Sequence, residues 1–175
     1  MSTQLGFYVN TDRCIKCYAC EVACKQWNGI KAGGVSRRNV YEVSDGVFPD
    51  NTRTFISMSC MHCEKPACAS VCPAGAISKR EEDGVVFVNK DKCIGCRYCF
   101  FACPFGVPQY DKECMNKCDM CLENGGLEDG GPHCVATCPT KALNFGTMEE
   151  LSEMKIDKTA KQLANSEVGP SAVIV

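Results

Sequence analysis

The spacing of the cysteines constrains this chain more than any other feature, because sixteen of the seventeen fall into four successive runs of four. In chain order the runs are Cys14-x2-Cys17-x2-Cys20-x3-Cys24, Cys60-x2-Cys63-x4-Cys68-x3-Cys72, Cys93-x2-Cys96-x2-Cys99-x3-Cys103 and Cys118-x2-Cys121-x12-Cys134-x3-Cys138. Proline follows the last cysteine of runs two, three and four. The third run has the spacing that bacterial ferredoxins use to bind iron–sulfur clusters. Sixteen cysteines are the ligand count for four such clusters.

A disulfide framework and zinc binding are the alternatives to iron–sulfur binding for so many cysteines. A secreted disulfide framework goes with an even cysteine count and an apolar signal region, but the count here is odd and the sequence starts Met1-Ser2-Thr3-Gln4. Closed zinc sites use paired C-x2-C units, which give no role to a third cysteine and a trailing Cys-Pro. The pattern therefore favours iron–sulfur binding, with zinc as the minor alternative, and free thiolates indicate a reducing compartment during assembly.

In a ferredoxin run, three cysteines bind one cluster and the fourth reaches a second cluster. Only 20 residues separate runs two and three, so these runs are expected to share a lobe, and runs one and four must then pair across the sequence. The predicted ligand sets are Cys60, Cys63, Cys68 with Cys103; Cys93, Cys96, Cys99 with Cys72; Cys14, Cys17, Cys20 with Cys138; and Cys118, Cys121, Cys134 with Cys24. Run one departs from the pattern, since Lys25 and not proline follows its last cysteine.

Cys114 is the seventeenth cysteine, and we predict that it is not a ligand. A register that uses Cys114 and Cys118 together would abandon the C-x2-C loop that Cys118 and Cys121 supply. We expect a buried or half-buried free thiol.

His62 and His133 lie beside predicted ligands, and either imidazole could donate a hydrogen bond to a cluster. An exposed loop position is the simpler interpretation of His133, whereas Trp27 either shields a cluster or packs under the insertion that follows it.

Short strands are predicted before and after the cysteine runs. Residues 7–10 and 85–89 lead into runs one and three, and residues 76–78 and 142–145 follow runs two and four. Residues 77–88 are expected to form a hairpin that turns at Glu82-Asp83-Gly84, and residues 55–58 form another apolar strand. The predicted fold class is α+β, with two ferredoxin-like lobes related by a pseudo-twofold repeat, loop insertions and a C-terminal helix and tail.

The expected domain boundaries follow the pairing of the runs. One lobe comprises residues 1–50 and 110–146, the other residues 51–109, and residues 147–175 form a C-terminal helix and docking tail. Thr147 has the character of a helix N-cap, and the helix is expected to continue to about Leu163 before Gly169-Pro170 ends it. The apolar tail Ala172–Val175 and the Arg37–Val43 insertion are expected to offer surfaces to a partner.

Charge and hydropathy exclude several partners. The formal net charge is −2, and four clusters would add about eight negative charges, so nucleic acid is not an expected partner. No stretch approaches the ~20 apolar residues of a membrane span, and Arg37-Arg38 lies too far into the chain for a twin-arginine signal. We expect a cytoplasmic protein, or one that is membrane-associated or exported only through a partner subunit. Each basic residue beside a predicted ligand either offsets part of the charge or is a solvated loop side chain: Arg13, Lys16, Lys25, Lys65, Lys92, Arg97 and Lys117.

The segments SCMHCEKPACASVCPAGAI, CIGCRYCFFACPFGVPQY and KCDMC…CVATCPTKAL, together with RRNVYEV at residues 37–43, resemble a known family. It is the four-cluster electron-transfer subunit of dimethyl sulfoxide reductase-type molybdenum enzymes, and the resemblance covers roughly residues 5–150. It implies four [4Fe–4S] clusters that pass single electrons between a large molybdopterin or tungstopterin catalytic subunit and a membrane quinol-oxidising subunit or a soluble carrier. No catalytic residues of the chain's own are expected, since no nucleophile set, nucleotide loop or open metal position is present.

Three alternatives remain at this point. The chain is a free-standing polyferredoxin, or it serves a different oxidoreductase such as a formate dehydrogenase or an aldehyde oxidoreductase, or it is a structural or zinc-binding interaction module. All three leading positions of run three are cysteines, so a [3Fe–4S] cluster is not expected there.

Overall fold

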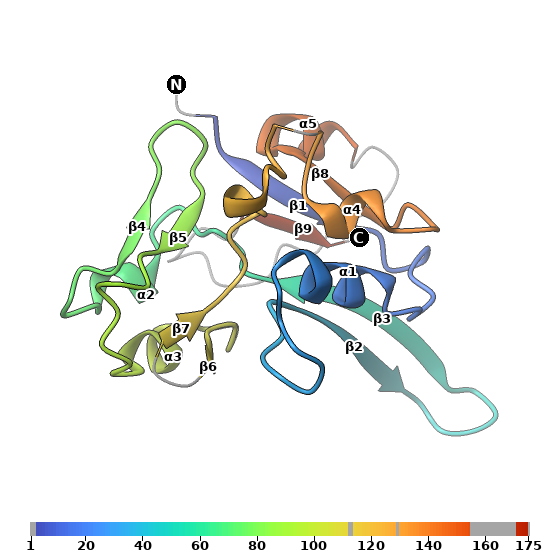
Figure 1. Cartoon of the computed structure of the whole chain (residues 1–175). Coiled ribbons are helices and arrows are strands. Elements are labelled where there is room, and N and C mark those ends of the chain that lie inside the picture. The colour runs from blue at the N-terminus through green and yellow to red at the C-terminus, as the bar shows by residue number, and fades with distance from the viewer. Residues whose placement is uncertain (1–2, 112–113, 129, 155–170, 175) are drawn as a thin grey trace.

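The computed structural model describes residues 3–111, 114–128, 130–154 and 171–174 (Figure 1). The elements are short and are spaced by the cysteine runs. In chain order they are β1 (Leu5–Val9), α1 (Ala19–Trp27), β2 (Arg38–Asp45), β3 (Thr52–Ser59), α2 (Ala67–Ser70), β4 (Ile77–Lys79), β5 (Val86–Val88), α3 (Tyr98–Ala102), β6 (Gln109–Asp111), β7 (Cys114–Asn116), the 3-10 helix η1 (Leu122–Asn124), α4 (His133–Ala136), β8 (Leu143–Thr147), α5 (Met148–Glu153) and β9 (Ala172–Ile174). This is the α+β composition that the sequence predicts.

The three-stranded sheet has the order β8-β1-β9, with β1 antiparallel to β8 and parallel to β9. Phe7 of β1 lies opposite Phe145 of β8, and their ring centroids are 5.8 Å apart. The buried face of this sheet packs against cysteines of runs one and four: Cys20, Cys118, Cys134 and Cys138. The sheet therefore forms one wall of the region in which the ligands of runs one and four gather.

The predicted hairpin of residues 77–88 is confirmed. β4 and β5 pair antiparallel from Ile77 opposite Val88 to Lys79 opposite Val86, and Gly84 in the turn adopts a φ of 71°. Ile77 and Val86 form a second buried cluster with Cys99 and Met115. Cysteines of runs two and three pack against that cluster: Cys68, Cys72 and Cys93. Figure 1 shows β4, β5, α2 and α3 on one side of the molecule and the three-stranded sheet on the other.

The two sides repeat one local arrangement. The strand before run one pairs with the strand after run four, and the strand before run three pairs with the strand after run two. The Asn10 amide donates to the Ala142 carbonyl at 2.8 Å, and the Asn89 amide donates to the Ala76 carbonyl at 2.8 Å. Each asparagine side chain then accepts from the amides two and three residues further on. These matched bonds support the pairing of the runs, whereas an overall pseudo-twofold relation stays a prediction, as do the domain boundaries.

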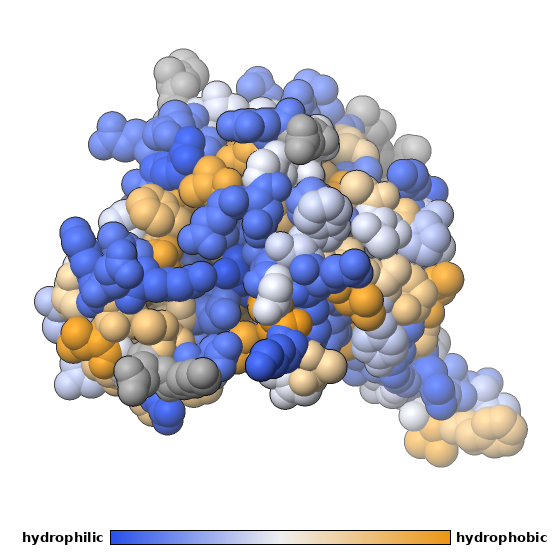
Figure 2. All heavy atoms as spheres, viewed as in Figure 1, coloured by the Kyte–Doolittle hydropathy of each residue, from blue (hydrophilic) through white to orange (hydrophobic). Residues whose placement is uncertain are grey.

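β2 and β3 form a hairpin in register from Arg38 opposite Ser59 to Asp45 opposite Thr52. The strand predicted at residues 55–58 lies within β3. Figure 1 shows this hairpin projecting from the body of the molecule, and Figure 2 shows apolar side chains at its tip. Val47 and Phe48 at the tip are 82% and 87% exposed.

The C-terminal expectations are confirmed in part. Thr147 caps α5 through a capping box with Glu150. The predicted continuation of this helix to Leu163 and its end at Gly169-Pro170 lie outside the described residues. The expectation that the tail offers a surface to a partner is wrong for Ala172, which is buried because β9 pairs with β1 as the edge strand of the chain's own sheet. No helix in the described part of the chain is long and apolar enough to cross a membrane.

We predict that replacing Gly6 by alanine loosens β9. A Cβ atom at Gly6 would lie 2.6 Å from the carbonyl oxygen of Ser171, in the backbone that enters β9. Overpacking of this kind costs about 1–3 kcal/mol. The amides of β9 should therefore exchange hydrogen about tenfold faster, measured by mass spectrometry on protein purified without oxygen.

Gly146→Ala is the matched control, because Gly146 lies directly opposite Gly6 in the sheet. The nearest atom to its added Cβ is a carboxylate oxygen of Glu150 at 2.9 Å, and none of the three nearest atoms belongs to the backbone that enters β9. This variant should leave the exchange of β9 unchanged. Equal exchange of β9 in both variants would contradict the role assigned to the Gly6–Ser171 contact.

Candidate metal centres

The four C-x2-C loops share one backbone feature. The residue before the second cysteine has a positive φ in every run: 56° at Lys16, 42° at His62, 66° at Gly95 and 56° at Met120. Residues other than glycine adopt this conformation at a cost, and it persists where the surrounding structure imposes it. The same turn, repeated with four different residues, therefore reflects a requirement of the loop and not a preference of any one side chain.

Two cavities are each lined by the four cysteines of one predicted ligand set. Three cysteines of run two and the last cysteine of run three line a cavity with about 430 Å³ of space between protein atoms: Cys60, Cys63, Cys68 and Cys103. Three cysteines of run one and the last cysteine of run four line a second cavity with about 350 Å³: Cys14, Cys17, Cys20 and Cys138. The fold thus places cysteines from different runs together, as the exchange of the fourth ligand requires.

The third set lies around the second buried cluster. Cys93, Cys99 and Cys72 pack against or within this cluster, and Cys96 of the same set is exposed. The Ala76 amide donates to Cys72 Sγ at 3.3 Å, and the Met115 amide donates to Cys93 Sγ at 3.4 Å. The Tyr110 hydroxyl lies 2.9 Å from Cys99 Sγ. Donors of this kind are available to stabilise ionised sulfur.

The fourth set is wholly buried and comprises Cys24, Cys118, Cys121 and Cys134. The pKa of the Cys24 thiol is raised to about 12, mainly by burial and then by the nearby Cys134 and Cys121, while Arg38 lowers it. Burial likewise raises the pKa of Cys118, with Cys134 and Cys24 acting in the same direction. These mutual effects place Cys24 of run one among the cysteines of run four.

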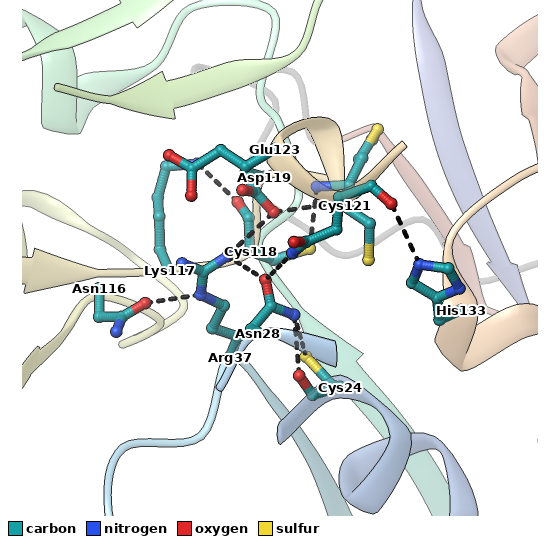
Figure 3. Close-up of polar contacts among 12 residues, drawn as sticks. Cys24, Asn28, Arg37, Asn116, Lys117, Cys118, Asp119, Cys121, Glu123 and His133 are labelled. Carbon is teal, nitrogen blue, oxygen red and sulfur yellow. Dashed lines mark hydrogen bonds and ion pairs between the residues drawn. The ribbon is translucent and has the colours of Figure 1, made fainter. Parts of the chain in front are cut away.

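Arg37 connects the elements around this fourth set (Figure 3). Its Nε donates to the Asn116 side chain at 2.6 Å, and one of its terminal nitrogens donates to the Asn28 side chain at 2.7 Å. The same nitrogen forms an ion pair with Asp119 at 3.0 Å. One buried guanidinium thus holds together β7, the residue after α1 and the loop of run four.

The partners of Arg37 in turn contact two members of the set. Asn28 donates to the Cys24 carbonyl at 2.8 Å, and its Nδ2 lies 3.8 Å from Cys24 Sγ. The Asp119 carboxylate accepts from the Cys121 amide at 3.0 Å. The position of Cys24, the predicted ligand that no proline follows, is therefore fixed through Asn28.

The donor chemistry fits iron–sulfur clusters. Burial raises the pKa of Cys63 to about 11 and that of Cys68 to about 12, so these thiols alone would be protonated at neutral pH. A bound cation removes that proton, because a coordinating thiol is deprotonated by the metal. The sulfurs surround cavities, and within the described part of the chain no three metal-binding side chains meet at a single point.

The remaining candidates have definite places. Cys114 is half-buried in β7, and its thiol lies 3.7 Å from the Lys90 carbonyl. His62 is completely buried, and its Nδ1 accepts from the Val86 amide at 2.9 Å, so the ring proton is on Nε2. The expectation of an exposed loop position for His133 is wrong, because it begins α4 and stacks on Trp27 with centroids 3.9 Å apart.

Sequence reasoning missed the burial of two arginines. The expectation of a partner surface is wrong for Arg37 and Arg38, which are only 6% and 1% exposed. Lys117 is also buried, lines the first cavity and donates to the Cys118 carbonyl at 2.8 Å. A signal was available in β3, since Ser57 and Ser59 alternate onto one face of the strand and offer oxygen acceptors there.

Comparison with known proteins agrees with this geometry. The model of the 4Fe-4S dicluster domain family matches residues 52–148. The chain is 44% identical over 170 residues to the B polypeptide of the anaerobic dimethyl sulfoxide reductase of Escherichia coli (strain K12), covering 91% of this chain and 82% of that protein. It is 38% identical over 169 residues to the B polypeptide of the sulfite dehydrogenase of Allochromatium vinosum, covering 85% and 70%. It is 36% identical over 182 residues to the formate dehydrogenase iron-sulfur subunit of Wolinella succinogenes, covering 91% and 89%.

Cysteine-lined cavities and a dicluster domain define an iron–sulfur protein that binds [4Fe–4S] clusters. With relatives above 30% identity over most of both sequences, this protein belongs to the family of iron–sulfur electron-transfer subunits of dimethyl sulfoxide reductase-type oxidoreductases. The resemblance recognised in the sequence is thereby confirmed. It is a subunit of the non-catalytic kind.

We predict that Cys103→Ser damages the cluster whose other ligands are on run two, although Cys103 belongs to run three. Its sulfur lines the cavity of Cys60, Cys63 and Cys68. Electron paramagnetic resonance of the reduced protein should show one altered or missing cluster, while iron analysis shows a loss of at most about one cluster.

Cys114→Ser is the control, since it also removes one thiol from this side of the molecule. The variant should keep every cluster signal and its full iron content. Loss of a cluster in Cys114→Ser would overturn the register of run four, and an unaltered spectrum in Cys103→Ser would overturn the exchange of the fourth ligand.

Proposed function

We propose that this chain holds four [4Fe–4S] clusters on the sixteen cysteines of its four runs. In this proposal it passes single electrons between a large molybdopterin or tungstopterin catalytic subunit and a second redox partner. When bound, each cluster accepts and releases one electron. The observation that carries the proposal is that each of two cavities is lined by the four cysteines of one predicted ligand set. We further propose that the four sets lie in one continuous order through the molecule, with the exposed Cys17 and Cys96 at its two ends.

The order follows from contacts between neighbouring sets. Cys68 and Cys93 pack against the same buried cluster, which supports adjacent positions for the sets led by runs three and two. Cys60 packs against the buried cluster that contains Cys118 and Cys134, which supports adjacent positions for the run-two and run-four sets. Cys20 of the run-one set belongs to the same buried cluster as Cys118 and Cys134. The proposed path therefore runs from the set led by run three through those of runs two and four to that of run one.

Both ends of this path lie at the surface. Cys17 and Cys96 are the exposed cysteines of the described chain, and they belong to the two terminal sets. Ile15 is 60% exposed beside Cys17, and Ile94 is 68% exposed beside Cys96. Further exposed apolar side chains follow at each end: Tyr18 and Val22 at the first, Tyr98, Phe100 and Phe101 at the second. Exposed apolar surface of this kind marks sites of protein contact.

We assign one end to the catalytic subunit and the other to a membrane quinol-oxidising subunit or a soluble carrier. The projecting tip of the β2–β3 hairpin, with Val47 and Phe48, is a further contact surface on the same argument. Relatives named as parts of reductases and dehydrogenases support a subunit over a polyferredoxin that diffuses freely. In this proposal any attachment to a membrane or export from the cytoplasm occurs through a partner.

We predict about sixteen iron atoms and as many acid-labile sulfides per chain, the content of four [4Fe–4S] clusters. Protein purified without oxygen and assayed colorimetrically for both elements provides the measurement. A content of about eight would reduce the proposal to two clusters, and zinc in place of iron would reject it.

We also predict that each apolar end binds a different partner. In the double variant Ile94→Ser with Phe101→Ser, or in Ile15→Ser with Val22→Ser, a tagged chain should lose most of one co-purifying partner and keep the other, with the iron content unchanged. The large subunit should depend on only one of the two ends. Met154→Ser, at an exposed apolar residue that follows α5 and belongs to neither end, is the control. Retention of every partner by both double variants would contradict the assignment.

A further inference from the structure

Arg38 places a positive charge inside the protein without a carboxylate among its hydrogen-bond partners. The residue is the first of β2, and it is 1% exposed. One terminal nitrogen donates to the Ser57 hydroxyl at 3.2 Å and its carbonyl at 3.3 Å, and the other donates to the Ser59 hydroxyl at 2.9 Å. These acceptors are neutral, and the Nε of Arg38 has no hydrogen-bond partner in the described structure. A buried cation without a countercharge is costly, so the environment must supply negative charge.

Cysteines lie on two sides of Arg38, and they carry negative charge as thiolates when a cluster is bound. Ser57, which accepts from Arg38, lines the cavity of the run-one set, and its hydroxyl lies 3.3 Å from Cys20 Sγ. The guanidinium lies over the ring of Phe7, 4.5 Å from its centroid. Phe7 is in the buried cluster that contains Cys20 together with Cys118 and Cys134 of the run-four set. Arg38 therefore lies between the last two ligand sets of the proposed path.

The adjacent Arg37 shows what distinguishes this position. Arg37 is also buried, but its charge is balanced by Asp119 at 3.0 Å. The ionisable groups that act most strongly on Arg38 are instead cysteines of the two neighbouring sets: Cys134, Cys118, Cys20 and Cys24. A purely structural arginine would be expected to have its charge balanced within the protein, as Arg37 has.

Resting on the proposed function, we propose that the buried positive charge of Arg38 raises the reduction potentials of the clusters held by the run-one and run-four sets. A [4Fe–4S] cluster with four thiolate ligands gains one negative charge when it is reduced. A fixed cation nearby stabilises that extra charge, and burial keeps solvent ions from screening it. Arg38 thereby makes reduction of the clusters at this end of the path more favourable than it would be with the same ligands alone.

The test is a redox titration of the intact complex, followed by electron paramagnetic resonance. Where a wild-type cluster is half reduced, Arg38→Gln should lower its ratio of reduced to oxidised form about tenfold, a shift of about 59 mV for one electron. Two of the four potentials should move, and the other two should move less. Arg38→Lys, which keeps the charge, should keep both potentials close to their wild-type values.

Two further comparisons separate charge from structure. Ser59→Asp would place a carboxylate against the guanidinium and neutralise it while Arg38 stays, so it should lower the same two potentials, whereas Ser59→Asn should not. Arg53→Gln removes the same charge from an exposed position on β3. It should change the ratio of reduced to oxidised form of each cluster by no more than a few-fold.

Each outcome is decisive. Unchanged potentials in Arg38→Gln with full iron content overturn the proposal, and so do equal potentials in Ser59→Asp and Ser59→Asn. If Arg38→Gln fails to retain its clusters, the Ser59 pair carries the test alone. A wild-type protein with fewer than four clusters would instead reject the proposed function, which the iron analysis detects independently.

Discussion

Burial of many thiols close together is the physical constraint on which the rest of this structure depends. The interior of a chain this size would ordinarily be filled by aliphatic and aromatic side chains, but here both buried clusters contain cysteines as principal members. Buried thiols resist ionisation and bind iron only as thiolates, so the protein must surround them with amide donors and cations. Lys117 and Arg38 meet this requirement from inside the protein, next to different ligand sets.

Local features were predictable from the sequence because local rules govern them. The alternation and turn residues of 77–88 predict a hairpin, and Thr147 followed by Glu150 predicts a helix start. The family was recognisable because the spacing of the cysteines records the shape of the group they bind. The interior position of Arg38 was not predictable, since β2 taken alone has the composition of an exposed strand. Its burial depends on serines of β3 and on Phe7 of a distant strand. The stacking of His133 on Trp27 likewise joins residues far apart in the sequence.

Run one differs from the other three runs in the residue that follows its last cysteine. Proline follows the last cysteine in runs two to four, and the helices there have four or five residues. Lys25 takes the place of proline in run one, and α1 continues to Trp27, nine residues in all. The additional turn brings Asn28 next to Cys24 and within reach of Arg37. Where proline is absent after the last cysteine, the helix continues and a polar network can form that holds the predicted ligand Cys24.

The sheet arrangement also orders how the protein can form during synthesis. The side of the molecule with runs two and three is built from one continuous stretch, so its contacts are available as soon as that stretch has left the ribosome. β1, in contrast, is made early but finds its neighbours only in β8 and β9, which lie at the other end of the described sequence. For most of translation, the cysteines of run one therefore have no run-four cysteines beside them. Under the proposed function, cluster delivery to that side is a late event, and those thiols need protection from oxidation until it occurs.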